Sequence, residues 1–216
     1  YDAFVEEGSP GGNSPIQSGG FGGGGLGGGV IRLIADTIRG EGDIRANGGT
    51  GQGSNHPGAG TGGGGSGGGV LLAADHLTVT GNIETKGGQR GISTRPQHEG
   101  SDGGNGRIKL LYGSHGEISG TFIGATTQGV LPPVALSSPT HPDPKLVYND
   151  DFDAVAFTWE KPFPGVAGYY FAASKTQYAV PTDSDTQVSG ESKVLPGSAF
   201  ATSGTHYFHI ASVNAA

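Results

Sequence analysis

The sequence predicts an all-β protein in two parts, a glycine-rich β-solenoid followed by a β-sandwich. Glycine tracts around residues 19–29 and 60–69 each lead into an alternating apolar stretch, and the pattern returns after Gly106. Beyond Val130 the tracts end and aromatic residues gather. Such a pattern, repeated at a nearly constant spacing along the chain, is typical of stacked units, each of which buries an apolar face against the next.

The composition bounds how such a protein is stabilised. Glycine accounts for 45 of the 216 residues and proline for 13, a share near that of low-complexity chains. Charged residues are only 14% of the chain, and runs of valine, isoleucine and leucine are present, so the pattern favours an ordered chain over a disordered one. Hydrophobic residues make up 33%, which predicts a thin core.

Charge and segment lengths exclude some partners. The net charge is −7 and no basic run occurs, so nucleic acid is not an expected partner. No stretch of about eighteen apolar residues occurs, so no membrane span is expected. The chain has no cysteine or methionine and begins at Tyr1. We expect a secreted protein at the cell surface whose signal peptide has been removed, although an excised fragment would begin in the same way.

Three repeat units are expected, at residues 18–58, 59–101 and 102–129. In each unit a glycine tract precedes a strand of about six to nine residues, a turn with glycine and a short second strand. The stretch from Val30 to Thr37 alternates and is rich in β-branched residues, as a strand requires. Flanking glycines disfavour a helix there.

The glycine tracts predict polyglycine II-like helices. These are extended threefold helices without internal hydrogen bonds, and neighbouring helices can hydrogen-bond laterally where side chains do not separate them. Ordering glycine costs more backbone entropy than ordering any other residue, so lateral bonds are needed to offset it. Flexible linkers are the alternative. The tracts lie at matching positions in each repeat, which favours the ordered bundle.

Residues 130–216 read as short strands between proline, glycine and aspartate turns, the pattern of a β-sandwich. The segment resembles the fibronectin type III and immunoglobulin-like modules of bacterial extracellular proteins, through Trp159, the GYYF motif at Gly168–Phe171 and Tyr207. The resemblance implies a buried tryptophan and a tyrosine hydroxyl that bonds back to the main chain. Residues 1–129 resemble, more loosely, the glycine-rich regions of large bacterial surface and filament proteins.

The sandwich lacks a last strand after the one that contains Tyr207. Either the chain is cut from a longer protein, or a partner supplies the strand by donor-strand complementation. The N-terminal extension, residues 1–17, is the candidate donor; a disordered terminus and a cap on the solenoid are the alternatives. The expected subunit interface joins one copy to the next head to tail. Its residues are Tyr1, Ala3, Phe4 and Val5 of the donor, and Tyr207, His209, Ala211 and Val213 of the acceptor.

No catalytic residues and no cofactor site are expected. The tract Gly20–Gly25 fits G-x-G-x-x-G, but no β-α-β unit surrounds it. Ile108 stands where a calcium-binding nonapeptide needs aspartate. No metal site is predicted; calcium near His141, Asp143 and Asp153, with Asp150 and Asp151, is a weaker interpretation than turn-forming residues. The chain is therefore not expected to be an enzyme.

Two functions fit these features. The first is a structural subunit of an extracellular filament, a homopolymer of identical subunits. The second is an adhesin or tail-fibre-like module that binds glycans or a receptor through loops such as residues 89–100. Ice binding is a third reading, but regular threonine rows are missing.

Overall fold

The computed structural model describes residues 5–14, 22–54, 59–93, 99–143, 153–162, 164–177, 179–200 and 202–214. Within these ranges the chain is built from strands, and the one helical element is the short 3-10 turn Gly197–Phe200. The prediction of an all-β protein is confirmed. The chain divides into two compact units, one up to Gly129 and one from Val130. Each unit is described by itself below.

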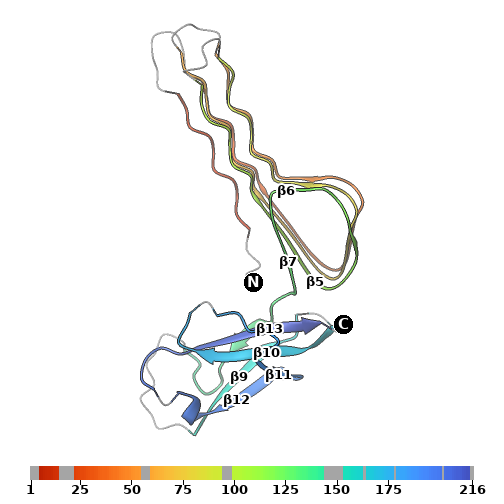
Figure 1. Cartoon of the computed structure of the whole chain (residues 1–216), viewed down its shortest axis with the longest axis vertical. Coiled ribbons are helices and arrows are strands. Elements are labelled where there is room, and N and C mark those ends of the chain that lie inside the picture. The colour runs from red at the N-terminus through yellow and green to blue at the C-terminus, as the bar shows by residue number, and fades with distance from the viewer. Residues whose placement is uncertain are drawn as a thin grey trace. The chain divides into compact units, whose positions relative to one another are not determined.

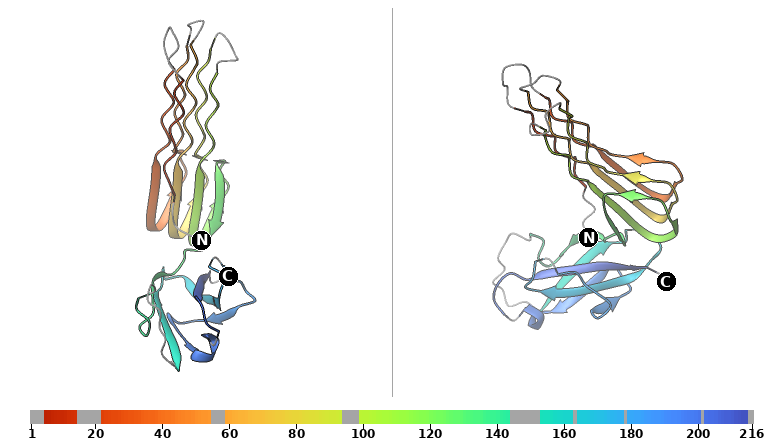
Figure 2. Two further views of the ribbon diagram at one scale, coloured as in Figure 1. Left: turned by 90° about the vertical axis from the view of Figure 1, so that its left-hand side faces the viewer. Right: turned by 45° about the horizontal axis from the view of Figure 1, so that its top comes forward.

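In the first unit, the repeat unit, the long strands lie side by side in a parallel sheet of order β1-β3-β5-β7 (Figures 1 and 2). The strands are β1 (Val30–Gly40), β3 (Gly69–Val79), β5 (Arg107–Ile118) and β7 (Ala125–Gly129). Val30 is paired with Gly69, and Gly69 with Arg107. Equivalent positions of successive repeats are therefore stacked in register.

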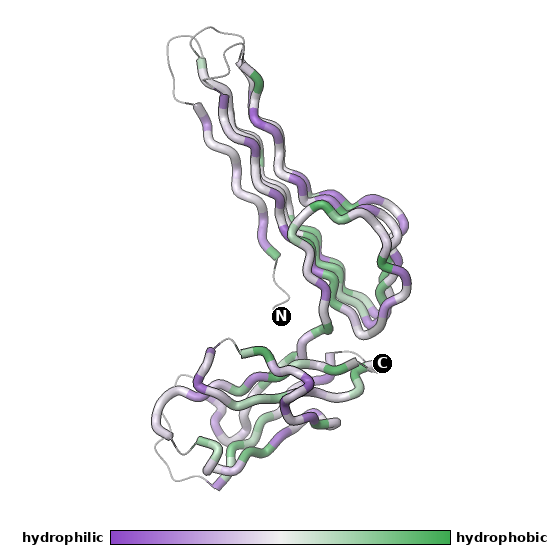
Figure 3. Tube along the Cα trace, viewed as in Figure 1, coloured by the Kyte–Doolittle hydropathy of each residue, from purple (hydrophilic) through white to green (hydrophobic). Residues whose placement is uncertain are grey.

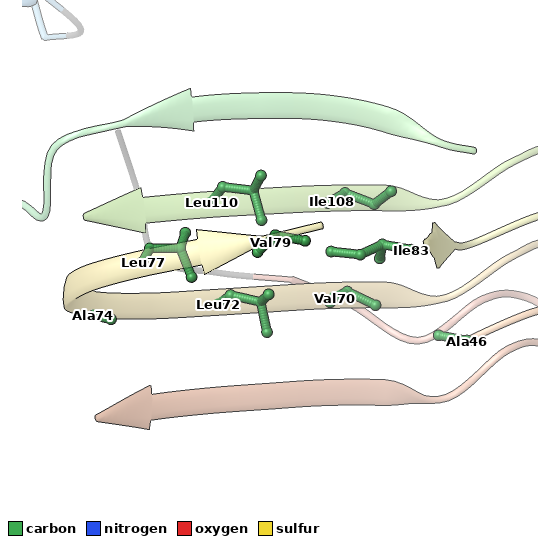
Figure 4. Close-up of a cluster of buried hydrophobic side chains, with 9 residues drawn as sticks. All are labelled: Ala46, Val70, Leu72, Ala74, Leu77, Val79, Ile83, Ile108 and Leu110. Atoms are coloured by element: carbon green, nitrogen blue, oxygen red, sulfur yellow. The ribbon is translucent and has the colours of Figure 1, made fainter. Parts of the chain in front are cut away.

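A second parallel sheet, of order β2-β4-β6, is formed by the short strand of each repeat. These strands are β2 (Ile44–Arg45), β4 (Ile83–Glu84) and β6 (Phe122–Ile123). Apolar side chains of long and short strands form one buried cluster (Figure 4). β3 bends so that Leu77 and Val79 face Leu72 and Val70, all of them essentially inaccessible. The alternating residues of the sequence thus provide the interior.

Polar side chains connect the repeats at the turn before each short strand. Asn82 donates through Nδ2 to Asp43 Oδ1 of the first repeat at 3.0 Å. Its Oδ1 accepts from the amide of Thr121 in the third repeat at 3.2 Å. A single amide side chain therefore bridges three successive units.

The glycine-rich parts form extended segments that run beside one another, and Figure 3 shows them as pale and purple stretches that extend away from the green apolar strands. Six segments are named here for reference: segment A (residues 8–14), segment B (22–29), segment C (46–54), segment D (60–68), segment E (85–93) and segment F (99–106). Main-chain hydrogen bonds connect these segments laterally. This lateral bonding repeats every three residues, as it does in threefold extended helices.

Segment D shows the pattern most fully. Three successive amides donate to three different segments: Gly62 to Gln52 in segment C at 3.0 Å, Gly63 to Gly12 in segment A at 2.9 Å, and Gly64 to Ser101 in segment F at 2.9 Å. The next three amides repeat the order: Gly65 to Gly49, Ser66 to Ser9, and Gly67 to Gly104. Segment D therefore has partners on several sides, which a flexible linker lacks.

Glycine is required where the segments approach most closely. A Cβ atom built on Gly65 would collide with the carbonyl oxygen of Leu26, and one on Gly67 with that of Thr85. Both obstacles are main-chain atoms, which cannot move aside as a flexible side chain can. The glycine tracts are thus a packing requirement of the repeat unit.

Segment A belongs to this bundle. The sequence assigns it to an N-terminal extension with a flexible connection, but Gly8 and Gly11 donate to Gly28 and Gly25 of segment B at 2.7 and 2.8 Å. The sequence interpretation missed this because segment A has no alternating apolar pattern. Its glycines are sufficient for lateral bonding, and no apolar face is needed.

The second unit, the C-terminal unit, contains two three-stranded sheets. One has the order β12-β9-β8 and the other β11-β10-β13, with antiparallel pairing. The strands are β8 (Val134–Ser137), β9 (Ala154–Glu160), β10 (Val166–Ser174), β11 (Thr186–Val188), β12 (Ser192–Pro196) and β13 (Tyr207–Asn214).

Aromatic side chains form the core of the C-terminal unit. Trp159 and Tyr169 are buried and meet edge to face, with ring centroids 5.3 Å apart. Phe157 is stacked on Phe208 at 4.0 Å. Burial raises the pKa of the Tyr169 phenol, and the Glu191 carboxylate adds to the shift.

Candidate assembly interface

Strand β13 lies at the edge of its sheet. Among the described strands it pairs with β10 on one side only, from Val166 opposite Asn214 to Ser174 opposite Tyr207. The main-chain groups on its other side are therefore available to a further strand. This is the edge at which the sequence predicts a missing strand.

A groove of about 440 Å³ lies next to this edge. Its walls include Phe208, Ile210 and Ser212 of β13, together with Val130 and Leu136. More of its lining comes from Val180, which is 57% exposed, while Leu136 is 44% exposed. The groove is thus bordered in part by exposed apolar side chains, beside the polar residues Thr182 and Asp183.

One polar group in the groove wall lacks a partner. Ser212 is 8% exposed, and its Oγ has no hydrogen-bond partner among the described residues. A buried hydroxyl without a partner costs about 1–3 kcal/mol, so such groups are uncommon. A strand laid along β13 brings main-chain donors and acceptors to this region.

The sequence names four acceptor residues on β13, and the structure locates each of them. Tyr207, His209, Ala211 and Val213 alternate with the core-facing residues of the strand, and all four are partly buried. His209 and Ala211 line the groove, and His209 Nε2 lies 3.1 Å from Ser174 Oγ.

The sequence interpretation missed Phe208 and Ile210. Both pack against the buried core and also line the groove. An inserted strand must cover the core-facing row as well as bond to the edge. The alternation of Phe208, Ile210 and Ser212 was the available signal.

The four donor residues are only partly described. Tyr1, Ala3 and Phe4 lie outside the described residues. Val5 is buried, at 8% exposure, and its Cβ lies 2.7 Å from the position that a Cβ on Gly69 of the same chain would take. Val5 is therefore already packed within its own repeat unit.

The resemblance to immunoglobulin-like modules implies two features that can be compared with the structure. Trp159 is buried at 4% exposure, as implied. Tyr207 begins β13, but its hydroxyl makes no hydrogen bond within the described part of the chain. The hydrogen bond from the tyrosine hydroxyl to the main chain, which the resemblance implies, is therefore not found among the described residues.

The loop at residues 89–100 is held at its base by Arg90. Its Nε lies 2.9 Å from Glu99 Oε2, and its amide donates to Asp102 Oδ1 at 2.8 Å. The hydrogen bond to Glu99 raises the pKa of the Arg90 side chain, and the charges of Glu99 and Asp102 add to it. Residues 94–98 lie outside the described residues.

No metal-binding group of three or more His, Asp or Glu side chains gathers within the described ranges. Asp150 and Asp151, named in the calcium interpretation, lie outside those ranges. In the part of the chain that the structure covers, no helix has the length and apolar character to cross a membrane.

Comparison of the chain with models of protein families, with curated proteins and with solved structures gave no significant match.

Proposed function

We propose that the chain is a structural subunit of an extracellular filament, in which each C-terminal unit accepts a β-strand along β13. The observation that carries the proposal is the open edge of β13 beside a groove with apolar walls. Strand addition at such an edge satisfies main-chain groups, while pockets beneath it take alternate side chains.

On this proposal the repeat unit is a glycine-rich β-solenoid with polyglycine II-like helices. The C-terminal unit is an immunoglobulin-like sandwich without its last strand. The stacked register of β1, β3 and β5 supports the first interpretation. The two antiparallel sheets around Trp159 and Tyr169 support the second. A cross-bonded glycine bundle gives each subunit a stiff body, which suits a filament.

The donor is a separate question. Residues 8–14 are bonded within their own repeat unit and Val5 is buried there, so a donor that includes any of these residues breaks contacts of its own unit. A donor longer than about four residues must release Val5. Deleting residues 1–6 tests this donor: filaments that persist exclude it, whereas loss of filaments supports it.

The acceptor groove can be tested without reference to the donor. Replacing Leu136 and Val180 by lysine puts charge into the groove at positions that are already exposed, so the fold is retained. Val194, 59% exposed on β12 and outside the groove, provides the matched control Val194→Lys. Negative-stain microscopy and sedimentation then measure assembly of the full chain.

We expect filaments from the unaltered chain and from Val194→Lys, and monomers from the groove variant. Equal assembly of all three proteins, or no assembly of the unaltered chain at any concentration, would contradict the proposal.

A further inference from the structure

The surface of the repeat unit has a second groove, of about 730 Å³, whose floor is segment D and whose walls are segments A and F. Its lining includes Gly12 and Asn13 from segment A, Thr61 and Gly64 from segment D, and Gly104 from segment F. All of these residues belong to the repeat unit, so the groove is a feature of the glycine bundle itself.

Five segments surround segment D, and each is bonded to the next. The bonds that connect them are Gly11 to Gly25 (A to B), Gly49 to Leu26 (C to B), Gly51 to Gln89 (C to E) and Gly103 to Gly88 (F to E). No bond between segments A and F is found among the described residues. The second groove is the gap between these two segments.

Donors and acceptors alternate around segment D. It donates to segments A, C and F, through amides such as those of Gly63, Gly62 and Gly64. It accepts from segment B, at the carbonyl oxygens of Gly63 and Ser66, and from segment E, at those of Gly62 and Gly65. Going around segment D, it donates to segment A, accepts from B, donates to C, accepts from E and donates to F. The sixth position, between segments F and A, completes this alternation if segment D accepts hydrogen bonds there.

The unused carbonyl oxygens of segment D fit this sixth position. Those of Thr61, Gly64 and Gly67 receive no hydrogen bond from the described part of the chain. They are three residues apart, so in a threefold extended helix they form one row with a spacing of about 9 Å. Thr61 and Gly64 line the second groove.

We propose that the second groove binds an extended glycine-rich peptide segment of a partner chain, which occupies the sixth position around segment D. One N–H group in every three of that segment donates to the row of free carbonyl oxygens. The match in spacing favours a peptide in the same threefold conformation over other extended polymers. This site belongs to the glycine bundle and the β13 edge to the C-terminal unit, so the two sites involve different parts of the chain.

The structure restricts the side chains of the occupant. The segments that surround segment D approach it so closely that Cβ atoms on Gly62, Gly65 or Gly67 would meet main-chain atoms. A sixth segment at the same spacing needs glycine in the rows that face the groove, and it can carry a larger residue only in the row that faces solvent.

A nonapeptide of three Gly-Gly-Lys triplets meets this requirement and is soluble. We suggest titrating it into the full chain labelled with carbon-13 and following the carbonyl shifts of Thr61, Gly64 and Gly67. A peptide with N-methylglycine for one glycine in each triplet loses the donors and is the ligand control.

Two protein variants test the location. Gly12 and Gly104 line the groove, and a Cβ on either meets nothing within 4 Å, so Gly104→Leu adds a large side chain at the groove wall without a collision. Gly29 has the same free space outside the groove, and Gly29→Leu is the matched control.

We expect saturable shifts at the three carbonyls, at least tenfold weaker binding to Gly104→Leu, and unchanged binding to Gly29→Leu. The proposal is wrong if the peptide causes no shift at millimolar concentration, or if the N-methylated peptide binds equally well. It is also wrong if an oligosaccharide such as a chito-oligomer shifts these carbonyls and the peptide does not.

Discussion

The amide of Gly25 lies 2.9 Å from the carbonyl oxygen of Gly63, although the two residues belong to different repeats. Three residues further along both segments, Gly28 repeats the contact with Ser66 at 2.9 Å. Contacts of this kind hold the repeat unit together where there are no side chains to pack. They also make its stability sensitive to a single added methyl group.

Substitution of Gly67 by alanine is expected to destabilise the repeat unit by more than about 2 kcal/mol, because the new Cβ collides with the main chain at Thr85. Gly104→Ala is the matched variant, since its Cβ meets nothing within 4 Å. Alanine there restricts the unfolded chain and should stabilise by about 0.4–1 kcal/mol. Calorimetric unfolding of both variants measures the difference. Equal effects would show that the segments are not closely packed.

Removal of the Leu72 side chain should leave a cavity in the repeat unit. Leu72 is completely buried in the cluster formed with Val70, Leu77 and Leu110. Leu72→Ala is expected to lower the free energy of unfolding by about 2–5 kcal/mol. Leu33→Ala is the control, because Leu33 occupies the equivalent position on β1 and is 45% exposed. If Leu33→Ala lowers the free energy of unfolding as much as Leu72→Ala does, the placement of β1 at the exposed edge and of β3 inside the sheet is contradicted.

The bridge made by Asn82 provides a third prediction. Asn82→Ala removes its bonds to Asp43 and Thr121 and should cost about 1 kcal/mol, a modest value because the site is exposed. Asn82→Asp keeps the acceptor toward Thr121 but places a carboxylate beside that of Asp43. Thermal unfolding at neutral pH should show that Asn82→Asp is less stable than the unaltered chain, and added salt should reduce the difference by screening the two carboxylates.

Tyr169 gives the C-terminal unit a dependence on alkaline pH. Burial raises the pKa of its phenol above the ordinary value of about 10, so the folded state keeps a proton that the unfolded state loses. The contribution is complete below pH 10 and is lost as the pH rises through the folded pKa. Urea unfolding, followed by the fluorescence of Trp159, the one tryptophan of the chain, should show this decline. Tyr169→Phe should reduce the decline, and an unchanged slope would count against the assignment.

The sequence predicted the all-β class, because its apolar stretches are short, rich in β-branched residues and bounded by glycine, as in the stretch from Val30. It predicted lateral hydrogen bonds between the glycine tracts, but it did not predict which segments are bonded to each other. A residue without a side chain carries no information about which segment lies beside it, so the membership of segment A was missed. At the β13 edge the sequence indicated an open strand and named the row with Tyr207, whereas the row with Phe208 and Ile210 packs against the core and also lines the groove.

Hydrogen exchange of the main-chain amides tests the lateral bonding of the glycine segments most directly. The amides from Gly62 to Gly68 of segment D are each donors to another segment. In the folded chain they should exchange at least a hundredfold more slowly than in an unstructured peptide of the same sequence. The exposed amide of Gly12, which donates to no described group, should exchange much faster and serves as the internal reference. Exchange of the Gly62–Gly68 amides at the rate of the unstructured peptide would show that these segments are not bonded into a bundle.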